Sequence, residues 1–516
     1  MKKISFIFLF IFTLFGQASF GAEQVLTISL DDCIIKAMQN NLNIAVEIYN
    51  PEIADVSVLK SKEQFMPTFD LTLGNRRNEN PSYWFIQGAE TVIDKYRNYS
   101  LSVNQKIPYG GNFSISLESY KSDTNAAFQL INPRFGSTLR LDFSQPLLKD
   151  FGFKVSRKEI LLARNNLDIS QNQFKTVLMD TVYLVQEGYW NLVYAIEDFK
   201  VKQQSLQLAR DLLKKNKKEV EFGKIAPIEI LNAEAVVATR EADILQAEAL
   251  IQKMEDNLKN LLNLSIEGGE GLEKIVPLDE PRFEKVAVSF EAALQQAVQS
   301  RPDIKINATT IKTNELNFKV AKNQMLPGLS LDFSYWSPGI SGNRVLYLDN
   351  DPFSGVIVGK EEGSAGGSIK DAFNQLYKNW TVGLTLSVPL SNFTSRADLV
   401  TARMQLEQSL VAQENVKKLA VLEVKDAVRD INTNSKRVEA YRVARELAAK
   451  RLEAEEKKLN VGLTTNYFVL QYQEEMAKAR SSELKALIDY NLALAKLEKA
   501  VGTSLDIRNI KITDIQ

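Results

Sequence analysis

The stretch "MLPGLSLDFSY" at residues 325–335 follows a long run of helical character and changes abruptly to alternating apolar and polar residues. A similar stretch, "MPTFDLTLG", occupies residues 66–74, and the prolines Pro67 and Pro327 are 260 positions apart. Alternation with a period of two predicts a β-strand, and proline commonly ends a helix. The chain is therefore predicted to pass from helix to strand twice, in the same way.

This repetition extends over most of the sequence. The ungapped matches pair Ser29, Ala37, Gln39, Ile44, Lys62, Gln64, Pro67 and Leu71 with Ser289, Ala297, Gln299, Ile304, Lys322, Gln324, Pro327 and Leu331. Further along, Pro146 corresponds to Pro389, and after a four-residue gap the offset settles at 239. The shared order of elements predicts an internal duplication. The predicted segments are a first repeat, a Gly/Pro-bearing linker, a second repeat and a C-terminal segment: 22–265, 266–281, 282–501 and 502–516.

A long helical pattern lies in each half. Residues spaced by seven recur along both patterns, with one charged interruption at Arg445: Val185, Leu192, Phe199, Leu206, Leu213 and Val220, then Val424, Ile431, Val438, Arg445, Leu452 and Leu459. Sustained steps of seven predict a coiled-coil seam. Each helix stops at a glycine, Gly223 or Gly462, before a second periodic run, so each half is predicted to hold a helical hairpin. A cytoskeletal rod would explain the helices alone.

Six segments of period-two alternation argue against a rod. They lie at 69–73, 98–107, 112–120, 139–143, 329–333 and 380–388. Such strands suit either a sheet half-buried on a soluble core or a membrane barrel that is apolar outside and wet within. The "PYGG" turn at 108–111 is tight, whereas long polar loops are expected at 75–96, 121–136 and 336–378. Short turns on one side and long loops on the other favour the barrel.

Composition excludes several classes of function. The 516 residues include 63 basic and 64 acidic side chains, so the net charge of −1 argues against a nucleic-acid partner. The chain has no histidine and a single cysteine, Cys33, which is expected on a helix face as a small apolar residue. We therefore expect no metal, no cofactor and no catalytic site.

The N-terminus predicts export. Lys2 and Lys3 precede an apolar run from Ile4 to Phe15, which is followed by small residues. We predict a signal peptide over 1–21, cleaved after Gly21 or alternatively after Ala18, so that the mature chain starts near 19–23. A membrane anchor is the other interpretation, but the run is short for a span. No other stretch approaches 18 apolar residues.

This combination resembles the TolC family of outer membrane efflux proteins over nearly the whole mature chain. The residues that carry the resemblance are "YWNLVYA" at 189–195, the prolines at the helix–strand junctions and the two tip glycines. The resemblance implies an α+β fold: an internally duplicated protomer of a trimeric outer-membrane β-barrel, continued by a long periplasmic α-helical coiled-coil barrel. It also implies a Gram-negative outer membrane location, with the lipid, a periplasmic adaptor and an inner-membrane transporter as partners.

The tips of the hairpins are implied to contact the adaptor. "VGL" at 461–463 is similar to the family's tip motif, whereas "FGK" at 222–224 departs from it. The candidate contact residues are Val461, Gly462, Leu463, Phe222 and Gly223.

The family's pore entrance is altered in this sequence. The family carries aspartates six and nine residues after the second tip glycine, and here those positions hold Phe468 and Gln471. The arginine expected two residues after the glycine is Thr464, and the same offsets in the first hairpin give Glu229 and Asn232. The resemblance therefore implies a mouth that lacks the family's acidic ring.

Glu475 lies four residues past Gln471, on the same helix face. Three copies of Glu475 could form a displaced acidic ring, or the side chain could face solvent on the outside. We predict a mouth that is constricted by the aromatic side chain of Phe468. Its closure should depend less on charged groups than is usual in the family.

Two classes of function are consistent with the sequence. The first is a passive outer-membrane exit duct of a tripartite efflux or type I secretion system, driven by an inner-membrane pump. The second is a non-channel periplasmic coiled-coil protein, either an adaptor or a structural component. An adaptor would need one hairpin and a compact β domain rather than two copies of strand–hairpin–strand, so we favour the duct.

Overall fold

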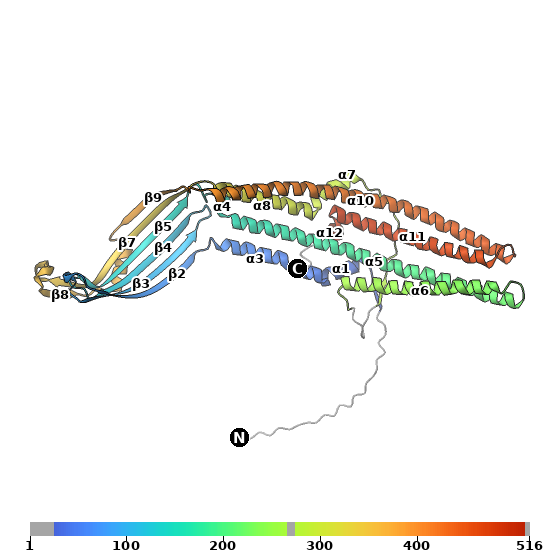
Figure 1. Ribbon diagram of the computed structural model, residues 1–516, viewed down its shortest axis with the longest axis horizontal. Coiled ribbons are helices and arrows are strands. Elements are labelled where there is room, and N and C mark those ends of the chain that lie inside the picture. Colours follow the sequence, from blue (N-terminus) through green and yellow to red (C-terminus); the bar gives the residue numbers. More distant parts are fainter. Residues whose placement is uncertain (1–24, 266–273, 511–516) are drawn as a thin grey trace, which may run out of the picture. The chain divides into compact units, whose positions relative to one another are not determined.

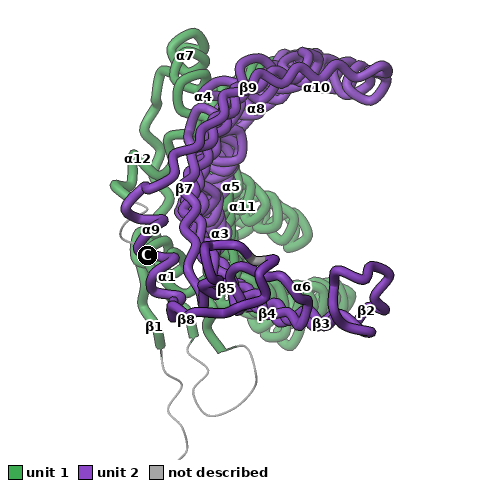
Figure 2. The backbone as a smooth tube through the Cα atoms, turned by 90° about the vertical axis from the view of Figure 1, so that its left-hand side faces the viewer, with its two compact units in different colours: residues 1–48, 174–302, 417–516 green, residues 49–173, 303–416 purple. Residues whose placement is uncertain are grey.

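The computed structural model describes residues 25–265 and 274–510. The predicted signal peptide, residues 266–273 of the linker and the last six residues lie outside the described residues. The chain divides into two compact units, coloured in Figure 2: Met1–Ile48, Phe174–Pro302 and Lys417–Gln516, then Tyr49–Gln173 and Asp303–Val416. All four boundaries between the units fall inside a predicted repeat, so both repeats contribute to each unit.

The second unit is built around one antiparallel sheet (Figure 1). Its strands are β2 (Thr68–Pro81), β3 (Thr91–Lys106), β4 (Asn112–Thr124), β5 (Ile131–Pro146), β7 (Gly328–Tyr347), β8 (Ile357–Glu361) and β9 (Asn379–Ser387). The order is β2-β3-β4-β5-β7, and β7 then pairs with β9 along its first half and with β8 at its far end. All six predicted strand segments therefore lie in one sheet. Strand β8 is a seventh strand that the sequence did not predict.

The register gives the sheet two chemically different faces. Leu71 pairs with Leu101, Leu101 with Leu117, and Phe143 with Phe333, so apolar side chains gather on one face. Serines and charged residues alternate with them and occupy the other face, as the period-two pattern predicts. We refer to these below as the apolar face and the polar face of the sheet.

Two of the predicted long loops are wrong. Residues 75–81 continue β2 and pair with 91–97 of β3, which leaves a connection at 82–90 that contains the short helix η1 (Phe85–Gln87). Residues 121–124 and 131–136 likewise extend β4 and β5. Most side chains of these extensions are polar and their few apolar residues do not alternate regularly, so the period-two pattern does not mark them, although backbone pairing continues. The expected loop at 336–378 is also partly strand, because β7 continues to Tyr347.

The rest of that segment is structured. It holds the short helices η2 (Leu348–Asn350) and η3 (Pro352–Ser354), the strand β8, and helix α9 (Ala365–Phe373).

The junction prolines lie where the sequence predicts them. Helix α3 (Tyr49–Glu63) ends before Pro67 and β2 follows, while α8 (Pro302–Gln324) ends before Pro327 and β7 follows. Proline lacks the backbone N–H that a continuing helix needs, which accounts for both transitions. On the return side, β5 ends at Pro146 before α4 (Phe153–Ser156), and β9 ends just before Pro389.

The first unit contains two helical hairpins. Helix α5 (Lys158–Glu221) pairs with α6 (Ile228–Leu261), and α10 (Phe393–Asn460) with α11 (Asn466–Val501); α5 and α10 each begin in the second unit. The predicted seam is confirmed in its first part, where Val185, Leu192, Val424 and Ile431 are buried. Toward the tips its apolar members, such as Leu213 and Leu459, are half-buried. At the charged interruption, Arg445 Nε lies 2.6 Å from Glu483 of α11, so an ion pair replaces apolar packing.

A small subdomain surrounds these hairpins in the same unit. It consists of β1 (Val25–Ile28) paired in parallel with β6 (Lys274–Pro277), α1 (Leu30–Asn40), α2 (Leu42–Glu47), α7 (Phe290–Ser300) and α12 (Ser504–Ile507). The duplication is visible at the hydrogen-bond level, because Ser29 caps the N-terminus of α1 and its counterpart Ser289 caps that of α7.

Two tyrosines hold the segment between the repeats. The Tyr189 hydroxyl donates to Asp279 at 2.8 Å, and the Tyr490 hydroxyl donates to the Glu284 carbonyl at 2.6 Å. The "YWNLVYA" aromatics Tyr189 and Trp190 are buried, as expected for helix packing.

No helix within residues 25–265 or 274–510 combines the length and the apolar character that a bilayer span requires.

Cys33 gives a first prediction. Its thiol is buried on α1, and burial, reinforced by the nearby Asp32 carboxylate, raises the pKa of the thiol to about 12. At pH 8 the thiolate is therefore scarce and shielded. We expect maleimide to label less than about a tenth of the native protein over a time that labels the unfolded chain fully. Ser57→Cys in a Cys33→Ala background, an exposed position on α3, should label at once and serves as the control. Fast labelling of native Cys33 would contradict the packing of α1.

Candidate functional site

The two hairpin tips share one backbone design. At the second tip, the Gly462 N–H donates to the Leu459 carbonyl and the Leu463 N–H to that of Lys458. At the first tip, the same pair of bonds runs from Gly223 to Val220 and from Lys224 to Glu219. Both glycines have positive φ, 75° and 67°, which only glycine adopts without strain. The glycine spacing of 239 thus reflects two equivalent helix ends.

Apolar side chains project from both tips. Val461 and Leu463 are 69% and 78% exposed at the second tip, and Phe222 is 75% exposed at the first. Exposed large apolar groups beside a turn are typical of contact surfaces. The first tip therefore presents apolar bulk even though its sequence departs from the family motif.

The second tip is additionally braced by Glu455. Thr464 and Lys458 both donate to its carboxylate, the latter at 3.1 Å. These two donors, Thr464 first, hold the pKa of Glu455 below its usual range. Thr464, at the position where the family would carry arginine, therefore fastens the tip to its own hairpin.

The candidate mouth residues of the second hairpin lie along the first turns of α11. Phe468 and Gln471 are exposed, while the Gln471 amide donates to Glu475 at 3.2 Å. Glu475 also lies 3.6 Å from Arg451 of α10, whose guanidinium stacks over the Tyr472 ring. Glu475 is therefore partly neutralised within its own hairpin. Sequence spacing alone did not reveal this partner, because Arg451 comes from the other helix.

The candidates of the first hairpin are placed less symmetrically. Asn232 is exposed on α6, whereas Glu229 is half-buried and its backbone carbonyl accepts a bond from Asn216. The structure brings Gln471 and Glu475 together, and among the described residues no hydrogen bond or ion pair joins Glu229 or Asn232 to them.

Arg240 is a functional candidate that the sequence analysis missed. Its buried guanidinium donates to the Ser205 carbonyl of α5 at 2.6 Å and to the Leu470 carbonyl and Gln473 of α11 at 3.3 and 3.4 Å. Burial lowers the pKa of this group. The signal was present, because Ala233, Arg240 and Ala247 follow the seven-residue spacing on the buried face of α6, and a charge at such a position needs partners.

The polar face of the sheet carries two clusters of hydrogen-bonded and ion-paired side chains. Asp332 on β7 accepts hydrogen bonds from Ser144 at 2.6 Å, Ser330 at 2.8 Å and Thr385 at 3.2 Å. Asp142 on β5 is paired with Arg140 at 2.9 Å. A hydrogen-bonded face of this kind can border water, while the apolar face cannot.

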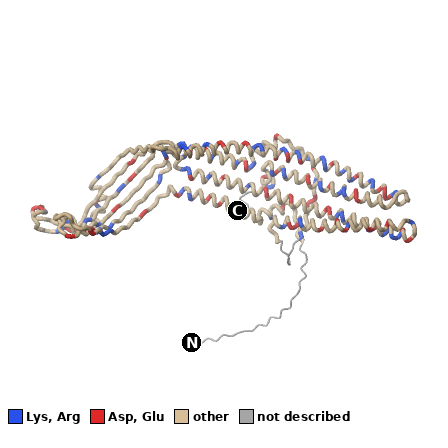
Figure 3. Tube along the Cα trace, viewed as in Figure 1, with Lys and Arg blue, Asp and Glu red and all other residues tan. Residues whose placement is uncertain are grey.

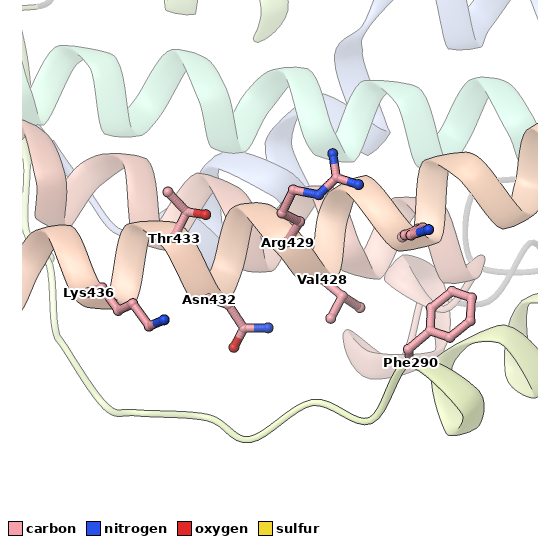
Figure 4. Close-up of a pocket in the computed structure, with 7 residues that line it drawn as sticks. Phe290, Val428, Arg429, Asn432, Thr433 and Lys436 are labelled. Atoms are coloured by element: carbon pink, nitrogen blue, oxygen red, sulfur yellow. The ribbon is translucent and has the colours of Figure 1, made fainter.

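A groove of about 450 Å³ lies along α10 in the first unit, where Phe290 of α7 meets it (Figure 4). Lys425, Arg429 and Lys436 line it, and Arg429 is paired with Asp426 at 3.2 Å. Both signs of charge alternate along α10 and α11 (Figure 3), so such a groove is ordinary for these helices. Within the described residues, no cluster of acidic, cysteine or histidine side chains is suited to a metal ion.

The chain is similar to outer membrane channels in sequence and in fold. The model of the family "Outer membrane efflux protein" matches residues 112–264 and 293–503. Outer membrane protein TolC of Vibrio cholerae is 24% identical over 80% of this chain and 91% of its own length. The alkaline protease secretion protein AprF of Pseudomonas aeruginosa is 21% identical over 70% of this chain and 69% of its own.

Solved structures agree on the fold. The CmeC outer membrane channel of Campylobacter jejuni superimposes with a TM-score of 0.64 at 15% identity, over 97% of this chain and 96% of that chain. The open MtrE channel of Neisseria gonorrhoeae gives 0.61 at 18% identity, over 92% and 89%.

These similarities decide between the two classes of function left open by the sequence. They favour the exit channel of an efflux or secretion system over a non-channel periplasmic protein, and the relatives are channel proteins rather than enzymes. The family match covers most of the chain and includes both halves of the duplication. The chain therefore belongs to the outer membrane efflux protein family.

Proposed function

We propose that three copies of this chain form one outer-membrane exit duct, in which the sheet of each copy supplies a third of a closed barrel. The observation that carries this proposal is the sheet itself. Its terminal strands β2 and β9 each pair on one side only among the described residues, and they run in opposite directions. Placing β9 of one copy beside β2 of the next gives an antiparallel seam, and repeating this closes the sheet.

Exposed side chains support the seam. Phe69, Leu71 and Leu73 on β2 are 60–66% exposed, and Trp380, Leu384 and Leu386 on β9 are similarly open. An unpaired strand edge in lipid would leave backbone groups without partners at a cost of several kcal/mol each. Closure with other copies removes both edges, and the apolar face then meets lipid while the polar face lines the passage.

The proposed barrel has eighteen strands. The hairpin of β3 and β4 pairs with β2 on one side and β5 on the other, so it is part of the same sheet rather than a separate element. Together with β7 and β9 this gives six strands for each copy, where the family resemblance leads to four. Three copies then supply eighteen strands instead of twelve. A density map of the purified trimer should show six membrane strands per copy; four, with the β3–β4 hairpin outside the membrane, would contradict this.

The duct is proposed to work with a periplasmic adaptor at the hairpin tips and an inner-membrane pump. Val461, Leu463 and Phe222 supply the apolar contact surface, and Gly462 and Gly223 shape it. In this proposal the pump supplies the energy and the duct is passive. Both efflux and protein secretion are consistent with this arrangement, since the family is described by efflux and the relative AprF by protease secretion.

Assembly and conduction test the function together. The purified protein should form trimers in mild detergent by light scattering and conduct ions in planar bilayers. Cysteines introduced in β2 and β9, at positions scanned along Leu71 and Leu384, should cross-link neighbouring copies into covalent trimers. A stable, folded monomer that neither conducts nor cross-links would overturn the proposal.

A further inference from the structure

Helix α9 lies on the apolar face of the sheet. It packs over β5 and β7 and reaches β4, all within the second unit. Ser368 of α9 is buried and its hydroxyl is 2.8 Å from that of Ser137, which in turn lies 2.9 Å from that of Ser119. Ser119 and Ser137 share the apolar face with Leu117 and Leu139, so α9 occupies the side of the sheet that faces lipid in the proposed duct.

Small residues allow this close approach. A Cβ at Gly339 of β7 would lie 2.1 Å from the Ser368 carbonyl oxygen and 2.7 Å from the Ala372 nitrogen. Glycine at this position therefore lets the helix backbone touch the strand. The last residue of α9, Phe373, and the following Leu376 and Tyr377 are exposed aromatic and apolar groups, which suit a membrane interface.

A cavity of about 390 Å³ forms between α9 and the neighbouring strands. Its wall is apolar along Leu71, Leu101, Leu117 and Ile369. Arg97 and Lys121 form the other end of the lining. Arg97 and Leu101 are four residues apart on β3, or about 13 Å along the strand. The cavity thus joins an apolar trough to a basic end.

The two cations are neighbours and are free to bind an anion. Arg97 pairs directly with Lys121 in the register of β3 and β4, and Lys121 lies over the Phe135 ring at 5.7 Å. In the described part of the chain neither side chain has an ion-pair partner. Two adjacent, unpaired cations repel each other unless an anion lies between them.

The height of this pair on the sheet is informative. Phe113 and Lys121 are eight residues apart on β4, or about 26 Å along the strand. At the strand tilt of about 35–45° that is usual in such barrels, this corresponds to about 20 Å of the apolar band of about 25 Å that a barrel presents to lipid. Phe113 follows the turn at 108–111 and lies beside the end of β5, after which the helices begin, so Arg97 and Lys121 lie near the opposite, extracellular edge of the band.

We propose that this cavity binds a phosphorylated, multiply acylated glycolipid of the outer leaflet. One acyl chain lies in the trough beneath α9, and a phosphate bridges Arg97 and Lys121. The inference rests on the proposed function, because the apolar face must meet lipid. A charge-assisted contact from arginine and lysine to phosphate is among the stronger hydrogen bonds available to a protein. The trough provides the second half of the recognition, which a free phosphate cannot use.

Native mass spectrometry of the detergent-purified trimer with hexa-acylated, bisphosphorylated lipid A tests the inference. The unmodified trimer should retain three lipids, and Arg97→Gln with Lys121→Gln should weaken retention at least about tenfold. Gly339→Leu should displace α9 from the sheet and weaken lipid retention to a similar extent. Arg76→Gln with Arg134→Gln removes two cations at a similar height from the polar face and should leave retention unchanged.

Other probes fix the identity of the ligand. Inorganic phosphate should not compete at millimolar concentration, and phosphatidylglycerol should bind more weakly than lipid A. Equal retention by both double-glutamine variants, or equal binding of phosphatidylglycerol, would overturn the inference. Conductance separates a failure of the lipid site from a failure of the proposed function. If the trimers conduct and the Arg97 and Lys121 changes leave lipid retention unaltered, only the lipid site is refuted. If the protein forms no conducting trimer, both the duct and the lipid site are refuted.

Discussion

Replacing Phe468 and Gln471 with aspartate should convert a channel that multivalent cations block weakly into one that they block strongly. In the proposed trimer the double variant adds six carboxylates, in two rings about 4.5 Å apart along α11, at the proposed periplasmic mouth. Charges gathered in a constriction of low dielectric focus the field and attract counter-ions. We expect the apparent affinity of a trivalent cation, added from the periplasmic side of a planar bilayer, to rise by about a hundredfold.

Glu475 provides the decisive control for this prediction. It is partly neutralised by Arg451 at 3.6 Å, so the unmodified channel should be blocked only weakly. Strong block that Glu475→Gln abolishes would show that the acidic ring has moved one helical turn along α11. Strong block that survives Glu475→Gln would refute both versions of the mouth.

Arg240→Ala should cost about 2–4 kcal/mol in the free energy of unfolding, because it removes buried charge-assisted hydrogen bonds and leaves a cavity. The guanidinium joins α6 to α5 and α11 through three acceptors, so its loss separates the two hairpins near the tips. Chemical denaturation of the purified trimer, followed by circular dichroism, measures the change.

Two further variants make this prediction specific. Arg210→Ala removes an exposed ion pair with Glu241, and such pairs contribute about 1 kcal/mol or less. Arg240→Met fills the space and avoids the cost of burying a charge, so it should be less damaging than Arg240→Ala. Equal losses for Arg240→Ala and Arg210→Ala would contradict the role assigned to the buried guanidinium.

The elements that the sequence predicts well are those with a sustained period. The steps of seven through Val185 and Val424 correspond to buried positions, and the alternation through Leu101 and Leu141 corresponds to the apolar face. The prolines at 67 and 327 mark the helix–strand transitions because their effect on the backbone is local. Duplication made each of these signals appear twice.

The features that the sequence did not predict depend on contacts between distant residues. Residues 75–81 of β2 pair with 91–97 of β3 through their backbones, and the side chains of 75–81 show no apolar alternation. Helix α9 reads "AGGSIKDAF", and its two internal glycines give little helix propensity. Its position is set by Gly339, which is remote in sequence. The Arg451–Glu475 pair was missed because its members come from different helices.

The position of the β3–β4 hairpin within the strand order has an evolutionary consequence. A hairpin is the smallest piece that can be added between two antiparallel strands without reversing either of them, and this hairpin lies between β2 and β5. The outermost strands, through which copies would join, are unaffected by such an insertion. In the evolution of such proteins, the diameter of the barrel can thus change by one hairpin per copy, while the strands that join neighbouring copies and the periplasmic helical hairpins stay the same.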